Sequence, residues 1–393
     1  MSNLIQKFTV SYRYPVCFTR RVFDPSNQTL AKILKPSASG RARALVVVDA
    51  GVAEVAPGLP QRIERYFRLR CGKIDLVRAP MRVPGGEQAK NGWAGVRALM
   101  TLAAETHLDR HSYLVALGGG SVLDMAGFAA SLVHRGLRLI RLPTTVLAQG
   151  DAGIGVKNGM NSGEVKNAVG TFAPPFAVIN DFDFLQTLPQ REWVSGIAEA
   201  FKVAIIQDRR FFRFLLKHAV ALRGRDQALM ETLVRKTATL HLRHIATSGD
   251  PFEYGSARPL DFGHWAAHRL ESLSNFTFGH GQAVAVGIAL DSTYAMLNGL
   301  ISPSERDAIL QGLTASGLPV WTPLLERSGA NGAPDVLVGL EQFREHLGGK
   351  LCVTLPNPLG AKTEVRSIRL PLMRKAIGLL RPGERRMEKL GKA

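Results

Sequence analysis

Two histidines and a carboxylate lie close together in the segment SARPLDFGHWAAHRL (residues 256–270). His264 and His268 are four positions apart, so on a helix they would share one face, and Asp261 precedes them. Imidazole nitrogens on one helical face can bind a metal ion, although the same spacing also occurs in helices that bind none. The segment leaves open whether both histidines bind a metal and what Asp261 does.

A charged pair is embedded in the apolar stretch GIAEAFKVAII (196–206). Glu199 and Lys202 share one face of the expected helix, where charges are costly unless they are paired or metal-bound. On this stretch alone, a structural Glu–Lys pair is the slightly better explanation. His280 lies next to glycines at the expected start of another helix. Together, Glu199, His264 and His280 would form a catalytic zinc site with one position open for substrate.

A glycine run and several charged residues in the first half of the chain suit the binding of a nucleotide. The glycines of LGGGSVLDMAG would let backbone N–H groups approach a phosphate at a helix start, although a tight strand–helix turn explains them equally well. Asp49 ends the strand LVVVD, where an acidic residue can hydrogen-bond a ribose. Glu87 and Lys90 in PGGEQAKN also fit a solvated helix start.

The densest set of polar residues lies in GDAGIGVKNGMNSGEVKN (150–167), which we expect to be a loop because it shows no regular period. It places Asp151, Lys157, Lys166 and three asparagines, Asn167 among them, between glycines. A purely structural loop seldom needs so many hydrogen-bond donors. We therefore favour anion or sugar binding here over a structural role.

Two kinds of structure must position these residues. The first half of the chain alternates apolar, β-branched runs with helical stretches, as in RALVVVDAGV and HSYLVALGGGSVLDMAGFAASLV, which is the rhythm of a parallel βαβ sheet. From about residue 186, apolar residues recur at the helical period instead. We predict an α/β fold with a Rossmann-like, nucleotide-binding domain at residues 1–187, a mostly helical domain with the candidate metal ligands at residues 188–393, and an active site in the cleft between them.

Composition narrows the classes of function. With 46% hydrophobic and 21% charged residues, the chain resembles an ordinary globular protein, and no apolar run is long enough to span a bilayer. Three separated cysteines and the lack of a signal-peptide pattern indicate a cytoplasmic protein. The formal charge of +18 suits nucleic acid or a small anionic substrate. Because the basic residues are scattered and no nucleic-acid-binding motif is recognisable, we expect the small anion.

The motifs together resemble those of the dehydroquinate synthase-like sugar phosphate cyclases, over roughly residues 40–355. The resemblance rests on GGGSVLDMAGFAASLVHRG, LPTTVLAQGDAGIGVKNGMN, KNAVGTF, GIAEAFK, LDFGHWAAH and HGQAVAVG, which occur in the order and at the spacing of the family. Members of this family oxidise one substrate hydroxyl with NAD, eliminate phosphate, reduce the ketone again and close a ring by aldol addition. The resemblance therefore implies a phosphate-eliminating lyase.

The resemblance also implies ligands for two cofactors. NAD would be bound by Asp49, Glu87, Lys90, Gly119, Gly120, Asp124, Thr144 and Thr145. A divalent ion, zinc or cobalt, would be held by Glu199, His264 and His280. His268 matches a family histidine near the substrate phosphate, so the idea that it shares a metal with His264 becomes less favoured.

Further residues are implied to act on the sugar phosphate. Catalytic roles are expected for Asp151, Lys202, His268 and Asp261, and substrate contacts for Arg135, Lys157, Lys166, Asn167, Arg243 and Arg258. Arg135 matches an arginine that reaches the phosphate site of the neighbouring subunit, which implies a homodimer.

The departures from dehydroquinate synthase bear on the substrate. Asp261 replaces an asparagine and is similar to the aspartate of cyclases that take sedoheptulose 7-phosphate, such as 2-epi-5-epi-valiolone synthases. Arg243 stands where that enzyme has a lysine for the substrate carboxylate, and Arg258 falls at or beside its arginine. Against the valiolone interpretation, those synthases usually have proline at the position of His268. The segment SGDPFEYGSARPLDFGHWAAH is most similar to the EboD-type cyclases of bacterial ebo gene clusters.

Four hypotheses result. The leading one is an NAD- and metal-dependent cyclase that converts sedoheptulose 7-phosphate to 2-epi-5-epi-valiolone. The alternative is 3-dehydroquinate synthase, acting on 3-deoxy-arabino-heptulosonate 7-phosphate. A non-catalytic nucleotide-binding scaffold is disfavoured because Glu199, Lys202, His264 and His280 are all present. An NAD-dependent alcohol dehydrogenase is disfavoured by the expected phosphate ligands.

Overall fold

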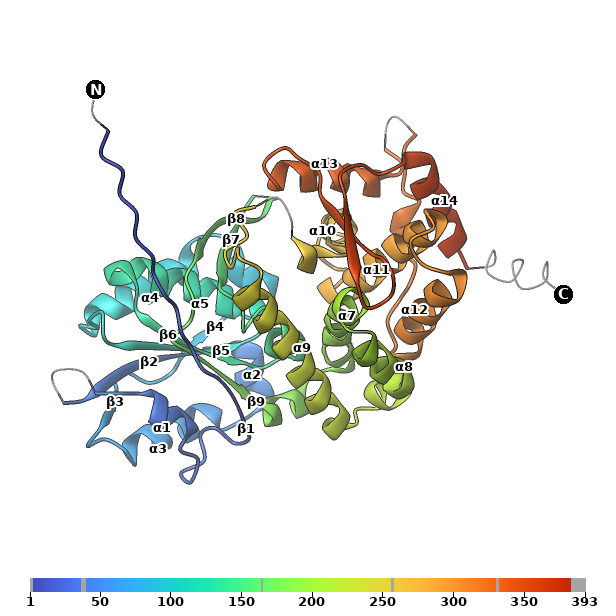
Figure 1. The fold of residues 1–393 in the computed structure, drawn as a ribbon. Helices are drawn as coiled ribbons and strands as arrows, with labels where there is room; N and C mark the ends of the chain where they lie inside the picture. Colours follow the sequence, from blue (N-terminus) through green and yellow to red (C-terminus); the bar gives the residue numbers. More distant parts are fainter. Residues whose placement is uncertain (1–2, 37–39, 164, 256–257, 330–331, 383–393) are drawn as a thin grey trace. The chain divides into compact units, whose positions relative to one another are not determined.

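The computed structural model describes residues 3–36, 40–163, 165–255, 258–329 and 332–382. The chain forms two compact units (Figure 1). The first comprises Met1–Pro143 and Val156–Asp181, and the second comprises Thr144–Gly155 and Phe182–Ala393. Ser256 and Ala257, which begin the histidine-containing segment, lie outside the described residues.

The first unit is built on a parallel sheet, which has seven strands among the described residues. The strand order is β1-β9-β6-β5-β2-β3, and β4 also pairs with β2. The strands are β1 (Val16–Thr19), β2 (Ala42–Asp49), β3 (Ile74–Leu76), β4 (Met81–Val83), β5 (Tyr113–Gly118), β6 (Arg138–Pro143) and β9 (Ala177–Asp181). Parallel sheets are usually covered on both faces, which explains why β2 and β5 are nearly continuous apolar runs rather than alternating ones.

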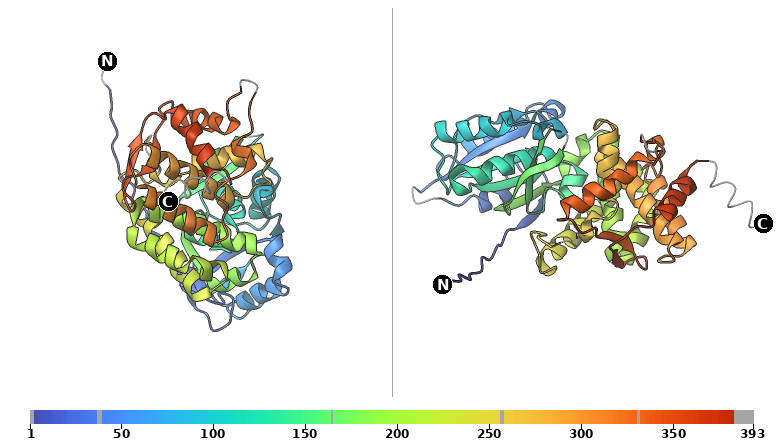
Figure 2. Two further views of the ribbon diagram at one scale, coloured as in Figure 1. Left: turned by 90° about the vertical axis from the view of Figure 1, so that its right-hand side faces the viewer. Right: turned by 90° about the horizontal axis from the view of Figure 1, so that it is seen from above.

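Helices flank this sheet (Figure 2). They are α1 (Thr29–Ile33), α2 (Ala50–Val55), α3 (Leu59–Arg68), α4 (Ala94–Glu105) and α5 (Gly120–Leu132), with short 3₁₀ turns η1 (Glu87–Lys90) and η2 (Val133–Arg135). Helix α5 packs on β5 and β6, and both α4 and η1 pack on α5. The glycine run therefore joins a buried strand to a buried helix, as the sequence predicts.

The polar segment after α6 (Val146–Gly150) is an antiparallel hairpin of β7 (Lys157–Ser162) and β8 (Val165–Phe172). The prediction of a loop is therefore wrong for these residues. Oδ1 of Asn158 accepts a hydrogen bond of 2.6 Å from Arg141. A side chain at Gly170 would collide with the Asn158 carbonyl oxygen. Because amides and glycines hold this hairpin, it lacks the β-branched alternation by which strands are recognised in a sequence.

The second unit is mostly helical, as predicted. After α6 and the 3₁₀ turn η3 (Phe182–Thr187) come α7 (Gln190–Gln207), α8 (Arg209–Arg223), α9 (Gln227–Thr247), η4 (Pro259–Asp261), α10 (His264–Leu273), α11 (His280–Leu297), α12 (Pro303–Ala315), η5 (Pro323–Leu325), η6 (Asp335–Leu337), α13 (Val338–His346) and α14 (Leu370–Leu380). A small hairpin of β10 (Val353–Pro356) and β11 (Lys362–Val365) completes it. Helices α7 and α11 pack on each other and are buried on nearly all sides, which makes them the centre of this unit (Figure 1).

Glycines allow α11 to approach its neighbours closely. A side chain at Gly287 of α11 would collide with the carbonyl oxygen of Gly263, the residue before α10, and one at Gly281 would collide with Ser195 of α7. Gly263 also has a φ of +78°, in the left-handed region that favours glycine. These contacts bring the starts of α10 and α11 close to the middle of α7.

The observed architecture confirms the predicted α/β fold class, with a parallel-sheet region followed by a helical one. The proposed division of the chain at residues 187 and 188 remains a prediction. Among the described residues, no helix combines the length and apolar character that crossing a membrane requires.

Candidate metal centre and nucleotide site

Three predicted metal ligands come together in the second unit. Glu199 lies in the middle of α7, and His264 and His280 are the first residues of α10 and α11. Oε1 of Glu199 is 3.6 Å from Nε2 of His264 and 3.4 Å from Nε2 of His280. All three ligand atoms lie within 4.8 Å of one another. The three residues, which we call the Glu/His/His triad, form a candidate metal centre.

The spacing of the Glu/His/His triad fits a tetrahedral ion. Ligands at about 2.0–2.1 Å from zinc in a tetrahedral arrangement are about 3.3 Å apart, close to the two Glu199–histidine distances. Glu199 is 1% exposed, and its Oε1 accepts no hydrogen bond of regular geometry. A buried carboxylate oxygen without such a partner is costly, and a cation between the three side chains would satisfy it. The donor set therefore fits a zinc-type ion.

Both histidines are oriented through their second ring nitrogen. Nδ1 of His264 lies 3.2 Å from the carbonyl oxygen of Phe262, and Nδ1 of His280 lies 3.1 Å from Oε2 of Glu271. These oxygens can only accept, so each Nδ1 carries the proton and each Nε2 keeps its lone pair for a metal. Such outer partners commonly fix the tautomer of a metal-binding histidine.

A second group of possible ligands, formed by His268, Glu271 and His280, overlaps with the first. It shares His280, whose Nδ1 already contacts Glu271. The ring of His268 lies 5.4 Å from that of His264 and 6.2 Å from that of His280. His264 and His268 occur together in neither group, and the role expected for His268 beside the substrate phosphate stays a prediction.

A chain of charged side chains leads outward from the Glu/His/His triad. Nζ of Lys202 is 2.5 Å from Oε2 of Glu199 and 3.7 Å from Oδ1 of Asp151. The same Asp151 oxygen is 2.6 Å from Nδ1 of His241, on α9. Lys202 is thus paired with two carboxylates, which explains how its charge is tolerated in an apolar helix.

Burial and pairing set the charges of these groups. Burial favours the neutral form of Lys202, but Asp151 and Glu199 outweigh it and raise the pKa of the Lys202 ammonium. Burial, followed by the nearby Lys202 charge, lowers the pKa of His264, so its imidazole is neutral as metal binding requires. The Asp261 charge opposes the effect of burial on the pKa of both Lys202 and His264.

A buried carboxylate ties the two histidine-bearing helices together. Asp291 of α11 is completely buried, and its oxygens accept hydrogen bonds from the Trp265 indole (2.9 Å) and the Gly263 backbone N–H (3.1 Å). These two residues flank His264 at the start of α10. Asp291 thereby fixes the backbone that presents His264.

The first unit contains most of the residues predicted to bind NAD. Asp49 ends β2 and accepts a hydrogen bond of 2.9 Å from the backbone N–H of Gly51. A side chain at Gly85 would collide with the Asp49 carboxylate, so glycine makes room for it. Helix α5 begins at Gly120. The residue at its N-cap position, Gly119, has no side chain that could cap the helix. Its first N–H groups therefore suit an anion such as a pyrophosphate.

Other polar residues of this unit pair with one another beside α5. Lys90 is 2.8 Å from Asp124 and also donates to the side chain of Asn167. Glu87 is 3.8 Å from Lys166. Burial raises the pKa of Glu87, but Lys166 and Lys90 outweigh this and lower it overall, so Glu87 is ionised. Residues predicted to bind cofactor and residues predicted to bind substrate thus form one hydrogen-bonded cluster.

The remaining predicted site residues are more scattered. Thr145 caps α6 by accepting from the Ala148 N–H (3.1 Å), and the neighbouring Thr144 has a buried hydroxyl with no hydrogen bond. Both threonines belong to the second unit. Arg135 is exposed with a φ of +62°, and Lys157 is exposed at the start of β7.

The two arginines expected to govern substrate choice differ in their surroundings. Arg243 is exposed on α9, whereas Nε of Arg258 is buried and has no hydrogen-bond partner among the described residues. Arg258 therefore has a buried N–H donor that is available to a ligand, whereas the side chain of Arg243 is open to solvent.

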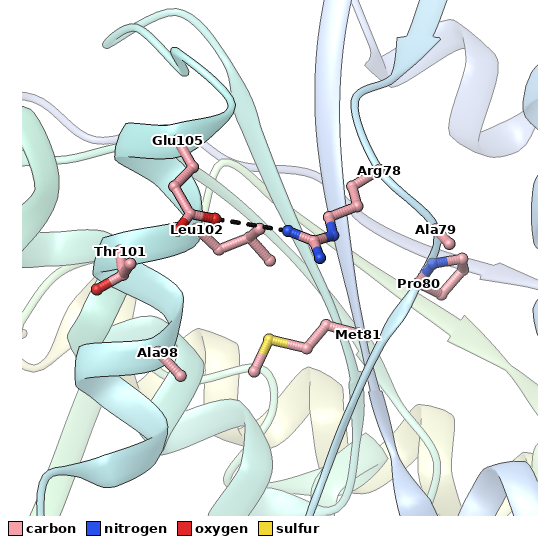
Figure 3. Close-up of a pocket in the computed structure, with 8 residues that line it drawn as sticks. All are labelled: Arg78, Ala79, Pro80, Met81, Ala98, Thr101, Leu102 and Glu105. Atoms are coloured by element: carbon pink, nitrogen blue, oxygen red, sulfur yellow. Dashed lines mark hydrogen bonds and ion pairs between the residues drawn. The ribbon is translucent and has the colours of Figure 1, made fainter.

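The first unit also contains a separate groove (Figure 3). It has a volume of about 550 Å³ and is lined mainly by apolar side chains such as Met81 and Leu102. Arg78 and Glu105 face each other across it at 3.5 Å, and both are more than half exposed. None of the predicted site residues lines it.

Three residues of the candidate site were not predicted from the sequence: His241, Glu271 and Asp291. Asp291 and Glu271 could have been suspected, because each is a carboxylate within a helix that carries a predicted ligand. No sequence pattern indicates a role for His241, because its partner Asp151 is 90 positions away in the chain.

Comparisons with known proteins agree with the motifs. Residues 80–195 match the family model of the 3-dehydroquinate synthase N-terminal region, and residues 196–332 match that of the C-terminal region. The chain is 34% identical over 360 residues to a 2-epi-5-epi-valiolone synthase from Streptomyces glaucescens, covering 91% of this chain and 87% of the relative. It is 32% identical over 348 residues to a 3-dehydroquinate synthase from Desulforamulus reducens, covering 88% and 91%.

A solved structure shows the same fold. The 2-epi-5-epi-valiolone synthase ValA from Streptomyces hygroscopicus subsp. jinggangensis 5008, with NAD⁺ and Zn²⁺ bound, is 27% identical and has a TM-score of 0.85, covering 97% of this chain and all of that one. The chain therefore belongs to the dehydroquinate synthase-like sugar phosphate cyclases, as its motifs predicted. It is an enzyme of the lyase class whose substrates are sugar phosphates.

Proposed function

We propose that this cyclase acts on sedoheptulose 7-phosphate and forms 2-epi-5-epi-valiolone, with NAD and a divalent ion as cofactors. The observation that carries the choice of substrate is the Asp261 carboxylate, whose charge acts on both Lys202 and His264. A fixed negative charge beside the reacting centre repels a substrate carboxylate and accepts hydrogen bonds from hydroxyls. The similarity to 2-epi-5-epi-valiolone synthases over most of the chain supports this choice.

Glu199, His264 and His280 would hold the ion, as zinc or cobalt. When bound, the ion would polarise a substrate hydroxyl and NAD would accept a hydride from its carbon. Lys202, held protonated by its two carboxylates, would donate hydrogen bonds to substrate oxygens. Asp151, held ionised, would accept a hydrogen bond from a substrate hydroxyl and so orient it.

The proposed NAD site uses Asp49, Glu87, Lys90, Gly119, Gly120, Asp124, Thr144 and Thr145. Two features of the structure fit a dinucleotide. The uncapped N-terminus of α5 offers backbone donors to a pyrophosphate, and the buried, unpartnered hydroxyl of Thr144 is a free hydrogen-bonding group. Asp49, which ends a parallel strand, lies where an acidic residue can bind a ribose.

For the substrate phosphate we propose Lys157, Lys166, Asn167 and His268, completed by Arg135 from a second copy of the chain. Arg135 is exposed in the turn after α5, so a second copy of the chain can reach it. The homodimer and a cytoplasmic location remain part of this proposal.

One observation favours 3-dehydroquinate synthase activity as a second candidate. The buried Nε of Arg258 has no hydrogen-bond partner among the described residues, and a guanidinium in this state suits a carboxylate. The similarity to 3-dehydroquinate synthases also extends over most of the chain.

The two candidates are separated by phosphate release. Metal-loaded protein with NAD is incubated with sedoheptulose 7-phosphate or with 3-deoxy-arabino-heptulosonate 7-phosphate, and the cyclised product is identified by mass spectrometry and NMR. We expect release from the first substrate, and an Asp261→Asn variant should lose part of this preference because the repelling charge is gone. Release from the carboxylate-bearing substrate alone would refute the proposal.

A further inference from the structure

His241 contacts a residue of the proposed catalytic set. It lies in the second half of α9, and its Nδ1 is 2.6 Å from Oδ1 of Asp151, which directly follows α6. The two side chains are 13% and 18% exposed, so neither is a freely solvated surface group. A hydrogen bond this short to a carboxylate is of the stronger, charge-assisted kind.

The pair continues the chain of charges that begins at the Glu/His/His triad. Glu199 and Lys202 are 1% and 2% exposed, whereas Asp151 and His241 are more accessible. Asp151 is therefore the outermost carboxylate of this chain, and His241 is the last group that holds it. Within the chain of charges, a substrate reaching the triad has access to Asp151 before Lys202.

The two carboxylate oxygens of Asp151 differ in their contacts. Oδ1 faces both Nδ1 of His241 and Nζ of Lys202, at 2.6 and 3.7 Å. Among the described residues, no hydrogen bond or ion pair reaches Oδ2. With Oδ1 held by two donors, the rotation of the carboxylate is fixed and Oδ2 remains available to another donor.

We propose that His241 is a positioning residue, whose Nδ1–H holds Asp151 so that Oδ2 meets a substrate hydroxyl. The role rests on the proposed function, in which Asp151 accepts that hydroxyl. Burial raises the pKa of Asp151, but Lys202 and then His241 outweigh it, so that the pKa lies well below its usual range. His264 adds a smaller effect in the same direction.

The geometry of the contact provides a matched pair of variants. Asparagine at position 241 places its amide where Nδ1 stands, whereas alanine removes the donor altogether. His218→Asn, on the neighbouring helix α8, changes a half-buried histidine whose ring lies 4.9 Å from that of Phe214. It serves as the control for a histidine-to-asparagine change that does not involve Asp151.

The test measures kcat and KM for phosphate release from the sugar phosphate that the wild-type enzyme turns over. A misplaced catalytic group costs on the order of 100-fold in rate, so we expect kcat of His241→Ala to fall by about that factor. KM, bound zinc and Tm should change little, and His241→Asn should recover at least a tenth of wild-type kcat. Wild-type kcat in His241→Ala would overturn the proposal, as would equal losses in the Ala and Asn variants.

Failure of the proposed function is distinguishable from failure of this role. If wild type turns over 3-deoxy-arabino-heptulosonate 7-phosphate but not sedoheptulose 7-phosphate, the same variants are compared on the substrate that is turned over. If wild type turns over neither, crystal structures of the zinc- and NAD-bound variants decide. Rotation of the Asp151 carboxylate in His241→Ala, reversed in His241→Asn, supports the positioning role, and an unchanged carboxylate in His241→Ala refutes it.

Discussion

Asp291 is expected to make the stability of this enzyme depend on pH. Its carboxyl group is completely buried, and burial raises its pKa from 3.8 to about 7, although hydrogen bonds from Trp265 and Gly263 oppose the shift. A pKa that is higher in the folded than in the unfolded chain means that the folded state binds the proton more tightly. The neutral acid is therefore the form that folding favours.

The sign and size follow from these two pKa values. Below about pH 4, Asp291 is protonated in both states and costs nothing. Between about pH 4 and pH 7 the unfolded chain ionises while the folded one does not, so the free energy of unfolding falls as the pH rises. At about 1.4 kcal/mol per pH unit, the loss amounts to roughly 4 kcal/mol by pH 7 and is constant above it.

Asp291→Asn removes this titration and keeps the shape of the side chain. Both oxygens of Asp291 accept a hydrogen bond, but the asparagine amide has only one oxygen, and its NH₂ group would face a donor. The variant therefore loses one hydrogen bond, at a cost of about 1–3 kcal/mol that does not depend on pH. Relative to wild type, the variant should therefore gain roughly 4 kcal/mol between pH 4 and pH 7.5.

The assay is urea denaturation of the zinc- and NAD-loaded proteins over this range, and the difference between variant and wild type is taken at each pH. The pH dependence of all other groups is common to both proteins and cancels in the difference. Difference values that stay constant across the range would refute the reasoning. They would mean that Asp291 is ionised in the folded state despite its burial.

Two further predictions concern the metal centre. Glu199→Ala should bind zinc far more weakly and lose turnover while it binds NAD as wild type does; metal analysis and NADH fluorescence test this, and full activity in metal-free buffer would contradict it. Glu271→Gln keeps a hydrogen-bond acceptor for His280 Nδ1 but removes the charge, so zinc affinity should fall by about 10–100-fold, measured by competition with a chelator; unchanged affinity would show that Glu271 does not tune His280.

The residues that could be predicted from the sequence are those that break a local pattern. Glu199 and Lys202 are charges in an apolar helix, and His264 and His280 begin helices beside glycines. Such exceptions are costly for folding, so a functional or pairing reason for them can be inferred. The α/β fold class was predictable in the same way, from the change of hydrophobic period along the chain.

The interactions that could not be predicted join distant positions or lack a pattern. His241 and Asp151 meet only because α9 packs against α6. The β7–β8 hairpin was missed because its strands are polar, with Asn158 buried against Arg141 instead of alternating apolar residues. Local propensity carries no information on contacts of this kind, which depend on the tertiary fold.

The polar groups of the second unit differ in how strictly their surroundings fix them. Glu199 and Lys202 are almost completely buried and paired, so a substitution there leaves an uncompensated charge and is expected to abolish activity on any sugar phosphate. Asp151, His241 and Asp261 are more accessible, and in the proposed function Asp151 meets the substrate while His241 positions Asp151. Variation at these three positions can change the preferred substrate while the metal centre is kept. The specificity of this cyclase should therefore be sought there rather than in the Glu/His/His triad.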